Sequence, residues 1–186
     1  MSKVSSEFVS LNLAVLTVSE RRTAEDDTSG DYLREAAQSS GHRIVDSAIV
    51  KENLYQIRAQ ISAWIASDEV QGILINGGTG FTAGDVVPEA IDVLFDREIE
   101  GFGELFRMVS YEDIGTATLQ SRALAGLANQ TVIFAIPGST RACRTAWERI
   151  IQEQLDARQK PCNFYPHLKN PLNGKPYSLC HHLSHN

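Results

Sequence analysis

The sequence lacks paired cysteines, long apolar runs and an excess of basic residues, and each shortage excludes a class of protein. Its three cysteines are widely spaced and odd in number, which favours neither a disulfide framework nor a paired-cysteine metal knuckle and fits a reducing cytoplasm. No run approaches the roughly 18 apolar residues of a membrane-spanning helix, and residues 1–10 lack a signal-peptide pattern. Lys plus Arg number 17 against 23 Asp plus Glu, a net charge of −6. We therefore expect a cytoplasmic protein with neither a nucleic-acid nor a membrane partner.

Motifs of nucleophilic and zinc hydrolases are also lacking. Neither HExxH nor GxSxG occurs, and no histidine stands in the loops that would face a ligand. Cys180-His181-His182 with His185 resembles a soft metal site, but it has no second ligand pair at a defined spacing. A polar tail explains these residues better, and the candidates that remain are phosphate-bearing ligands.

What the sequence does contain is an alternation of apolar strands and amphipathic helices. We expect strands at 11–18, 43–50, 72–76 and 131–136, separated by helices, while 98–110 and 118–127 are helical or irregular. Because parallel neighbours need helical crossovers, this order predicts a three-layer αβα fold with a mostly parallel sheet. We expect an N-terminal segment at 1–10, a single domain at 11–155, and a tail at 156–186 that is extended or wrapped on a neighbour. The tail holds four of the six prolines and four of the five histidines.

A glycine-rich loop is the strongest candidate for ligand binding. Gly77-Gly78-Thr79-Gly80 directly follows the buried strand 72–76, and ligands of open parallel sheets bind beyond the carboxyl ends of the strands. Glycines allow positive φ, so successive N–H groups can form a nest for an anion. The alternative is a tight turn that needs glycine only for steric reasons. No Gly-Lys-Ser/Thr follows, so this is not a Walker loop.

Asp85 follows this loop, and two interpretations stay open for it. As the N-cap of the helix that contains Pro88, it would be fully explained. Beside an anion-binding loop, its carboxylate could instead hold Mg²⁺ against phosphate oxygens. The two roles can coexist.

Three further polar segments each have a structural alternative. Pro137-Gly138-Ser139-Thr140, followed by Arg141, would form a second anion subsite or an ordinary capped helix. The acidic run 25–30 would bind a metal or complement a helix dipole. Ser121-Arg122 would present a hydroxyl and a guanidinium to a phosphate, or would lie on a solvated helix surface.

Six ordered motifs point to one family. They are LAVLTVS at 13–19, DTSG at 27–30, GGTG at 77–80 with Asp85 and PEA at 88–90, GFGE at 101–104, LQSR at 119–122, and IPGS at 136–139. In this order and at these intervals the chain resembles the MoaB/MogA family of molybdenum-cofactor biosynthesis proteins, over about residues 11–155. DREIEGFGELFRM and KPCNFYPHLKN make it most similar to the MoaB branch of that family.

The resemblance implies a fold that binds molybdopterin, a pterin dithiolene with a terminal phosphate. In active relatives this phosphate attacks the α-phosphorus of Mg-ATP, which releases pyrophosphate and leaves an adenylylated pterin. Such transfers depend mainly on positioning and on charge neutralisation. By the same resemblance, the site would comprise the glycine loop on the pterin or its phosphate (Gly77, Gly78, Thr79, Gly80), Asp85 as the metal-binding or catalytic carboxylate, and Asp27, Ser29, Gly30, Glu104, Ser121, Pro137, Gly138 and Ser139 around the pocket.

Three departures from the family pattern separate binding from catalysis. Where active relatives carry Pro-Asp after the second strand, this chain has Val50-Lys51 and then Glu52, and it has Gly84 and Val87 in place of an arginine and a hydroxyl residue. Lys51 disfavours Mg²⁺ by repulsion but would attract a phosphate. The leading hypothesis is therefore a molybdopterin-binding protein on an adenylyltransferase scaffold. The alternatives are an active adenylyltransferase, in which Asp85 and Glu52 share the catalytic work, and a non-catalytic scaffold or carrier.

The resemblance also bears on assembly and ligands. It implies a homo-oligomer, either a trimer or a hexamer, in which the tail is a candidate to reach across an interface. Mg²⁺ and ATP would be ligands of an active form, molybdopterin would be the small-molecule partner, and no tightly bound cofactor is expected.

Overall fold

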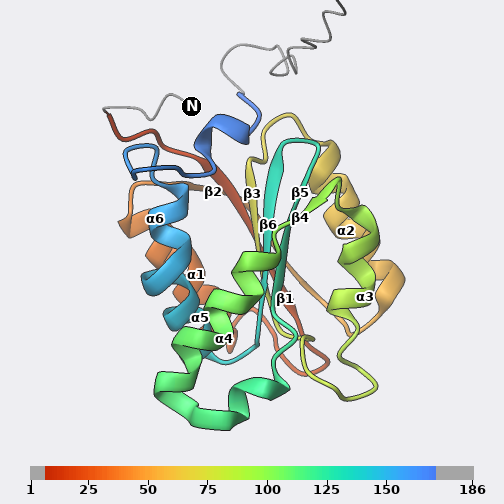
Figure 1. The fold of residues 1–186 in the computed structure, drawn as a ribbon. Helices are drawn as coiled ribbons and strands as arrows, with labels where there is room; N and C mark the ends of the chain where they lie inside the picture. The colour runs from red at the N-terminus through yellow and green to blue at the C-terminus, as the bar shows by residue number, and fades with distance from the viewer. Residues whose placement is uncertain (1–6, 171–186) are drawn as a thin grey trace, which may run out of the picture.

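The computed structural model of the chain describes residues 7–170, which form one six-stranded sheet with helices on both of its faces (Figure 1). The sheet has the order β2-β1-β3-β6-β5-β4. Its strands are β1 (Asn12–Val18), β2 (Arg43–Val50), β3 (Gly72–Asn76), β4 (Arg97–Glu98), β5 (Leu124–Ala128) and β6 (Thr131–Ile136). The first three in this order and β6 run parallel, whereas β5 is antiparallel to β6 and to β4.

The four parallel strands lie where the sequence predicts strands, and β1, β3 and β6 are the apolar runs among them. Every residue of β3 and β6 is buried, and in β1 only Asn12 is partly exposed. Such burial is typical of parallel strands that are covered on both faces. The register pairs Thr17 of β1 with Asn76 of β3, and Asn76 with Ile136 of β6. These three strands therefore end side by side, and the loops after them meet at one edge of the sheet.

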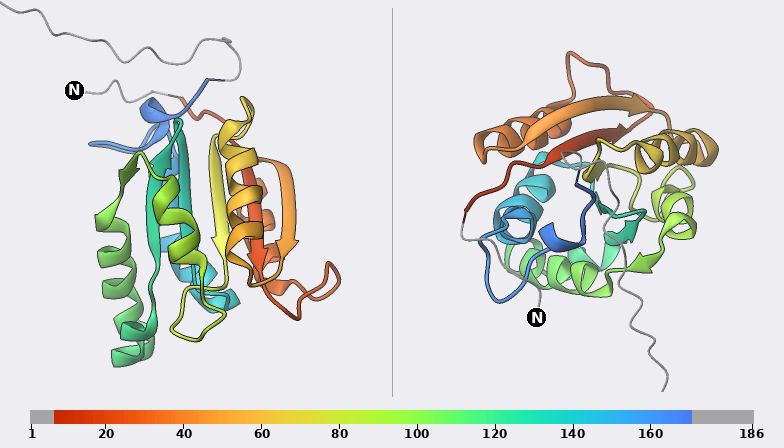
Figure 2. Two further views of the ribbon diagram at one scale, coloured as in Figure 1. Left: turned by 90° about the vertical axis from the view of Figure 1, so that its right-hand side faces the viewer. Right: turned by 90° about the horizontal axis from the view of Figure 1, so that it is seen from above.

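Helices cover the two faces of the sheet as separate layers (Figure 2). One layer holds α1 (Thr28–Ser39), α4 (Glu100–Ile114), α5 (Thr140–Ala146) and α6 (Gln152–Leu155), and the other holds α2 (Leu54–Ala66) and α3 (Val87–Ile91). Alternate residues of β1 divide between two cores, because Leu13 belongs to the core with Leu33 of α1 and Leu16 to the core with Ile57 of α2. The expected three-layer αβα fold is confirmed.

The antiparallel end of the sheet differs from the sequence expectation. The sequence predicts helical or irregular structure over 118–127, but Leu124–Ala128 is the strand β5, and the sequence gives no indication of β4. Asn129 and Gln130, with φ of 44° and 59°, form the two-residue turn between β5 and β6. Positive φ at both turn positions matches the twist of a tight hairpin. Pairing with β6 therefore makes a strand of LAGLA, a sequence without strong strand propensity.

Residues 156–170 lie against the same domain rather than extending from it. The Lys169 ammonium donates to the carbonyl oxygens of Ile65 (2.9 Å) and Ser67 (2.6 Å) at the end of α2. The side-chain amide of Gln71 donates to the Lys169 carbonyl at 2.7 Å, and Leu168 is buried in the core. The remaining part of the expected tail, with Cys180, His181, His182 and His185, falls outside the described residues. Within 7–170, no helix has the length and apolar character that crossing a bilayer requires.

Candidate functional site

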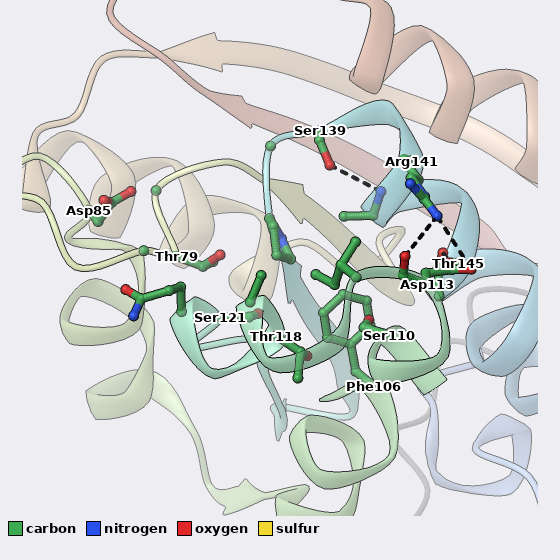
Figure 3. Close-up of a pocket in the computed structure, with 18 residues that line it drawn as sticks. Thr79, Asp85, Phe106, Ser110, Asp113, Thr118, Ser121, Ser139, Arg141 and Thr145 are labelled. Carbon is green, nitrogen blue, oxygen red and sulfur yellow. Dashed lines mark hydrogen bonds and ion pairs between the residues drawn. The ribbon is translucent and has the colours of Figure 1, made fainter. Parts of the chain in front are cut away.

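A pocket of about 270 Å³ opens at the carboxyl edge of β3 and β6 (Figure 3). Its walls come from the loop after β3, from α4 with the 3₁₀ segment Gly115–Gln120 that follows it, and from the loop after β6 with the first turns of α5. Asp85 and Thr79 lie on one side of this pocket, and Asp113 and Arg141 lie on the opposite side. The pocket therefore occupies the place where ligands of open α/β sheets bind.

The glycine loop forms its wall from backbone. Gly77 and Gly78 have φ of 94° and 66°, in the region that side chains avoid. A Cβ on Gly77 would overlap the carbonyl oxygen of Val18, and one on Gly78 would lie 2.7 Å from Cγ2 of Val87. Gly78, Thr79 and Gly80 line the pocket, whereas Gly77 is buried behind them. The glycines are therefore needed for steric reasons, and the loop also lines the pocket.

The loop after β6 touches the glycine loop. A Cβ on Gly138 would lie 3.0 Å from the Cα of Gly77, so the two backbones are in close contact. Ser139 is the N-cap of α5, and its hydroxyl accepts a hydrogen bond from the N–H of Ala142 at 3.1 Å. Pro137, Gly138 and Ser139 also line the pocket. A capped helix and a pocket wall thus coincide in one segment.

The DTSG residues 27–30 lie behind the pocket and contact the loop after β6. The Asp27 carboxylate caps α1 by accepting from the N–H of Gly30 at 3.0 Å, and it accepts from the Thr17 hydroxyl at 2.8 Å. The Ser29 hydroxyl donates to the carbonyl of Gly138 at 3.0 Å. None of Asp27, Ser29 and Gly30 lines the pocket. Their contacts hold α1 against the loop after β6. Because Asp27 caps α1, the acidic run is explained as charge that complements the dipole of this helix. Within 7–170, no group of three or more metal-ligating side chains occurs.

Asp85 is at the pocket, but it is not a helix cap. The N-cap position of α3 is Val86, which makes no side-chain capping bond. The Asp85 carboxylate instead accepts from the backbone N–H and the hydroxyl of Thr82, at 2.8 and 2.6 Å. Partial burial acts to raise the pKa of Asp85, but the bonds from Thr82 and Gly80 and the charge of Arg122 outweigh it and lower the pKa. An ionised carboxylate therefore faces the pocket at neutral pH.

On the wall opposite Asp85, Arg141 was a candidate for a second anion subsite, but the part that α4 supplies was not predicted from the sequence. Phe106, Ser110 and Asp113 of α4 line the pocket, and Arg141 donates to the Asp113 carbonyl at 3.2 Å. The Thr145 hydroxyl donates to the Asp113 carboxylate at 3.2 Å. These contacts join α4 to α5, which are distant in sequence. Only the helical spacing of the apolar residues in α4 could have indicated this wall.

Comparison with known proteins gives the family. Residues 14–157 match the family model described as a probable molybdopterin binding domain. Over 169 residues the chain is 70% identical to molybdenum cofactor biosynthesis protein B of Escherichia coli K12, which covers 91% of this chain and 99% of that relative. The protein of the same name from Bacillus cereus is 43% identical over 142 residues, 76% of this chain and 84% of the relative. The chain belongs to the MoaB/MogA family of molybdenum cofactor biosynthesis proteins.

Solved structures of MoaB/MogA proteins share the fold. A crystal structure of molybdenum cofactor biosynthesis protein B has a TM-score of 0.77 and 41% identity, and the match covers 79% of this chain and 92% of that one. The tungsten cofactor synthesizing protein MoaB from Pyrococcus furiosus has a TM-score of 0.69 and 34% identity, with 77% and 92% covered. The layers and the mixed sheet described above are therefore those of the family.

The departures of this MoaB/MogA member have distinct surroundings. Lys51 is exposed, and Glu52 is partly buried outside the pocket lining. A Cβ on Gly84 would overlap the Glu52 carboxylate, which therefore lies against the backbone just before Asp85. Val87 is fully buried and packs beneath Gly78. Because residue 84 is a glycine, the Glu52 carboxylate can occupy the space beside it. Val87 packs in the hydrophobic core.

The remaining predicted positions divide between pocket and surface. Ser121 lines the pocket, as the resemblance implies. Glu104 is exposed on α4 and does not line it. Arg122 is only 25% exposed and turns toward the glycine loop, so the expectation of a solvated helix surface is wrong for it.

Proposed function

We propose that this chain binds molybdopterin in the pocket and acts in molybdenum cofactor biosynthesis. The observation that carries the proposal is the contact between loop 77–80 and loop 137–139 at the carboxyl edge of parallel strands. Backbone N–H groups of such loops and the N-terminus of α5 favour an anion there. Membership of the MoaB/MogA family supports molybdopterin, whose terminal phosphate is such an anion.

The opposite wall suits the rest of the ligand. Phe106 supplies apolar surface, and the hydroxyls of Ser110 and Thr118 stand beside it in the lining. A pterin needs both flat apolar contact and a few polar partners, which is the usual composition of a small-molecule pocket. We therefore place the phosphate at the two loops and the pterin toward α4.

Mg-ATP-dependent adenylyl transfer is the second candidate function. Two observations favour it, the lowered pKa of Asp85 at the pocket wall and the Glu52 carboxylate beside residue 84. Mg²⁺ is commonly held by one or two carboxylates together with substrate phosphates, and of these two carboxylates Asp85 is the one that lines the pocket. When bound, Mg²⁺ would neutralise charge on the phosphates of ATP. Lys51 acts against the metal, and for that reason binding leads the proposal.

One experiment separates these functions. The purified protein is incubated with molybdopterin and Mg-ATP beside an active family member, and mass spectrometry follows retained pterin, adenylylated pterin and pyrophosphate. Retained pterin without product identifies a binding protein, whether a biosynthetic intermediate carrier or a scaffold. Product above background identifies an enzyme. A protein that retains no pterin contradicts the proposal.

Asp85 gives this experiment its variant. If the protein is an enzyme, Asp85→Asn should lower product formation by about 100-fold, the size of effect expected when one charge-stabilising group is lost. Asp92→Asn is the matched control, because Asp92 is exposed beyond α3 and outside the pocket. Normal turnover by Asp85→Asn would remove Asp85 from the catalytic assignment.

We also propose that the chain forms a homo-oligomer, a trimer or a hexamer. Leu105, Met108 and Tyr111 recur at three-residue spacing on α4 and are exposed, and Leu119 in the following 3₁₀ segment is 71% exposed. Contiguous apolar surface of this kind marks association sites. Light scattering should give a multiple of 20.5 kDa, and Met108→Glu should lower the mass. A monomer mass for the unmodified chain would contradict this proposal.

A further inference from the structure

Arg122 holds both ends of loop 80–85. Its Nε donates to the carbonyl of Gly80 at 2.7 Å, and its Nη2 donates to the carbonyl of Asp85. Its Nη1 pairs with the Glu89 carboxylate of α3. The guanidinium carbon lies 5.2 Å from the centre of the Phe81 ring, a distance at which a cation and an aromatic ring attract. One side chain therefore closes the loop across its base and fastens it to a helix.

The backbone around Arg122 joins this loop to the other wall of the pocket. The N–H of Arg122 donates to the carbonyl of Thr79 at 2.9 Å. On the other side, the guanidinium of Arg107 in α4 donates to the carbonyl of Ala123 at 3.2 Å. Segment 121–123 thus lies between the glycine loop and α4, the two walls that face each other across the pocket.

Arg122 can therefore affect the pocket only through loop 80–85, which it holds. Its side chain is directed to two carbonyls and one carboxylate, and it does not line the pocket. Asp85, whose carbonyl it holds, does line the pocket and presents its carboxylate there. A planar guanidinium presents five N–H donors in a rigid fork, whereas lysine carries its three donors on one compact nitrogen, so the two side chains are not interchangeable at such a site.

We propose that Arg122 is a positioning residue for the ligand pocket: it fixes loop 80–85 and thereby sets the affinity of the pocket for a phosphate-bearing pterin. The ligand named in this inference rests on the proposed function. The part that says Arg122 fixes loop 80–85 does not depend on it. In this role Arg122 does not bind the ligand itself. Its side chain and its backbone N–H hold the end of the glycine loop, and the neighbouring Ala123 carbonyl contacts Arg107 of α4.

The first test uses the ligand-free protein. Hydrogen exchange followed by mass spectrometry compares the unmodified chain with Arg122→Lys and Arg122→Gln. Peptides that cover 79–89 should exchange about tenfold faster in both variants, because charge-assisted bonds to the loop are lost, while β3 and β6 peptides stay unchanged. Arg149→Gln is the matched control, since Arg149 makes one surface ion pair with Glu112 at 3.0 Å. Unchanged exchange over 79–89 in Arg122→Lys would overturn the proposal.

The second test measures molybdopterin affinity by fluorescence quenching. Arg122→Lys should bind about tenfold more weakly, whereas Glu89→Gln, which keeps both carbonyl bonds, should stay within about threefold of the unmodified chain. Faster exchange with unchanged affinity would overturn the positioning role. If the unmodified chain itself binds no molybdopterin, the proposed function fails, and the exchange result still decides whether Arg122 fixes the loop. The lysine variant keeps the charge, so a folding failure of the glutamine variant does not block either test.

Discussion

At the scale of single residues, the pocket depends on where side chains are missing. Gly78 takes a positive φ directly above the fully buried Val87. Gly84 leaves room for the Glu52 carboxylate. In both places a neighbour already occupies the volume that a Cβ would need. Of the two glycines only Gly78 lines the pocket, so there the shape of the wall follows from the absence of a side chain.

Gly78→Ala should therefore destabilise the protein. A left-handed backbone costs a non-glycine residue about 1–2 kcal/mol, and the contact with Val87 adds to it, so we expect a loss of about 2–3 kcal/mol in the free energy of unfolding. Gly101→Ala is the control, because Gly101 lies in the first turn of α4 with nothing within 4 Å of a built Cβ. That change should be neutral or stabilising by about 0.5–1 kcal/mol. Urea denaturation measures both, and equal stabilities would contradict the loop conformation.

Local motifs reveal some of these residues and conceal others. The glycine loop and Asp85 stand together in the sequence, so their chemistry could be anticipated. Thr17 and Asn76 could not, because the bond from the Asn76 amide to the Thr17 hydroxyl (2.9 Å) joins strands 59 residues apart. A single sequence contains no signal for such a pair beyond two polar residues in apolar strands.

At the scale of elements, prediction succeeded where a segment alone determines its structure. The apolar runs of β1, β3 and β6 and the apolar spacing in α2 required no partner to be recognised. β5 is different, because its residues become a strand only by pairing with β6 through the turn at Asn129 and Gln130. The signal available in the sequence was Asn129, because asparagine is one of the residues that adopt positive φ. Gln130 obscured this signal, since glutamine is uncommon at positive φ.

At the scale of the whole molecule, a buried histidine links folding to pH. His42 is 4% exposed, and its Nδ1 accepts a hydrogen bond from the N–H of Leu11 at 3.2 Å. Its ring lies beside Phe8 and Trp147. Burial lowers the pKa of His42 to about 4, although the charge of Asp156 acts to raise it. The folded protein therefore keeps this ring neutral under conditions where an unfolded chain would protonate it.

Stability should consequently fall as the pH drops from 6.5 to 4. In this window the unfolded state binds a proton that the folded state excludes, so His42 removes up to about 3 kcal/mol, and below its folded pKa the loss levels off. Denaturation at several pH values measures the slope. His42→Gln should flatten it, whereas His167→Gln, at an exposed site, should leave it unchanged. An identical slope in the unmodified chain and His42→Gln would refute this explanation.

The strand order also has a consequence in time. β2, β1 and β3 are complete once residue 76 has been synthesised, but β4 and β5 join them only through β6, which ends at Ile136. During synthesis, chains emerge and fold from the N-terminus, so the open edges of β3 and β5 both wait for the same six residues. An unpaired edge invites pairing with another nascent chain. Between the synthesis of residue 76 and that of residue 136, strand edges that the folded sheet pairs are therefore open to pairing with another copy of the chain.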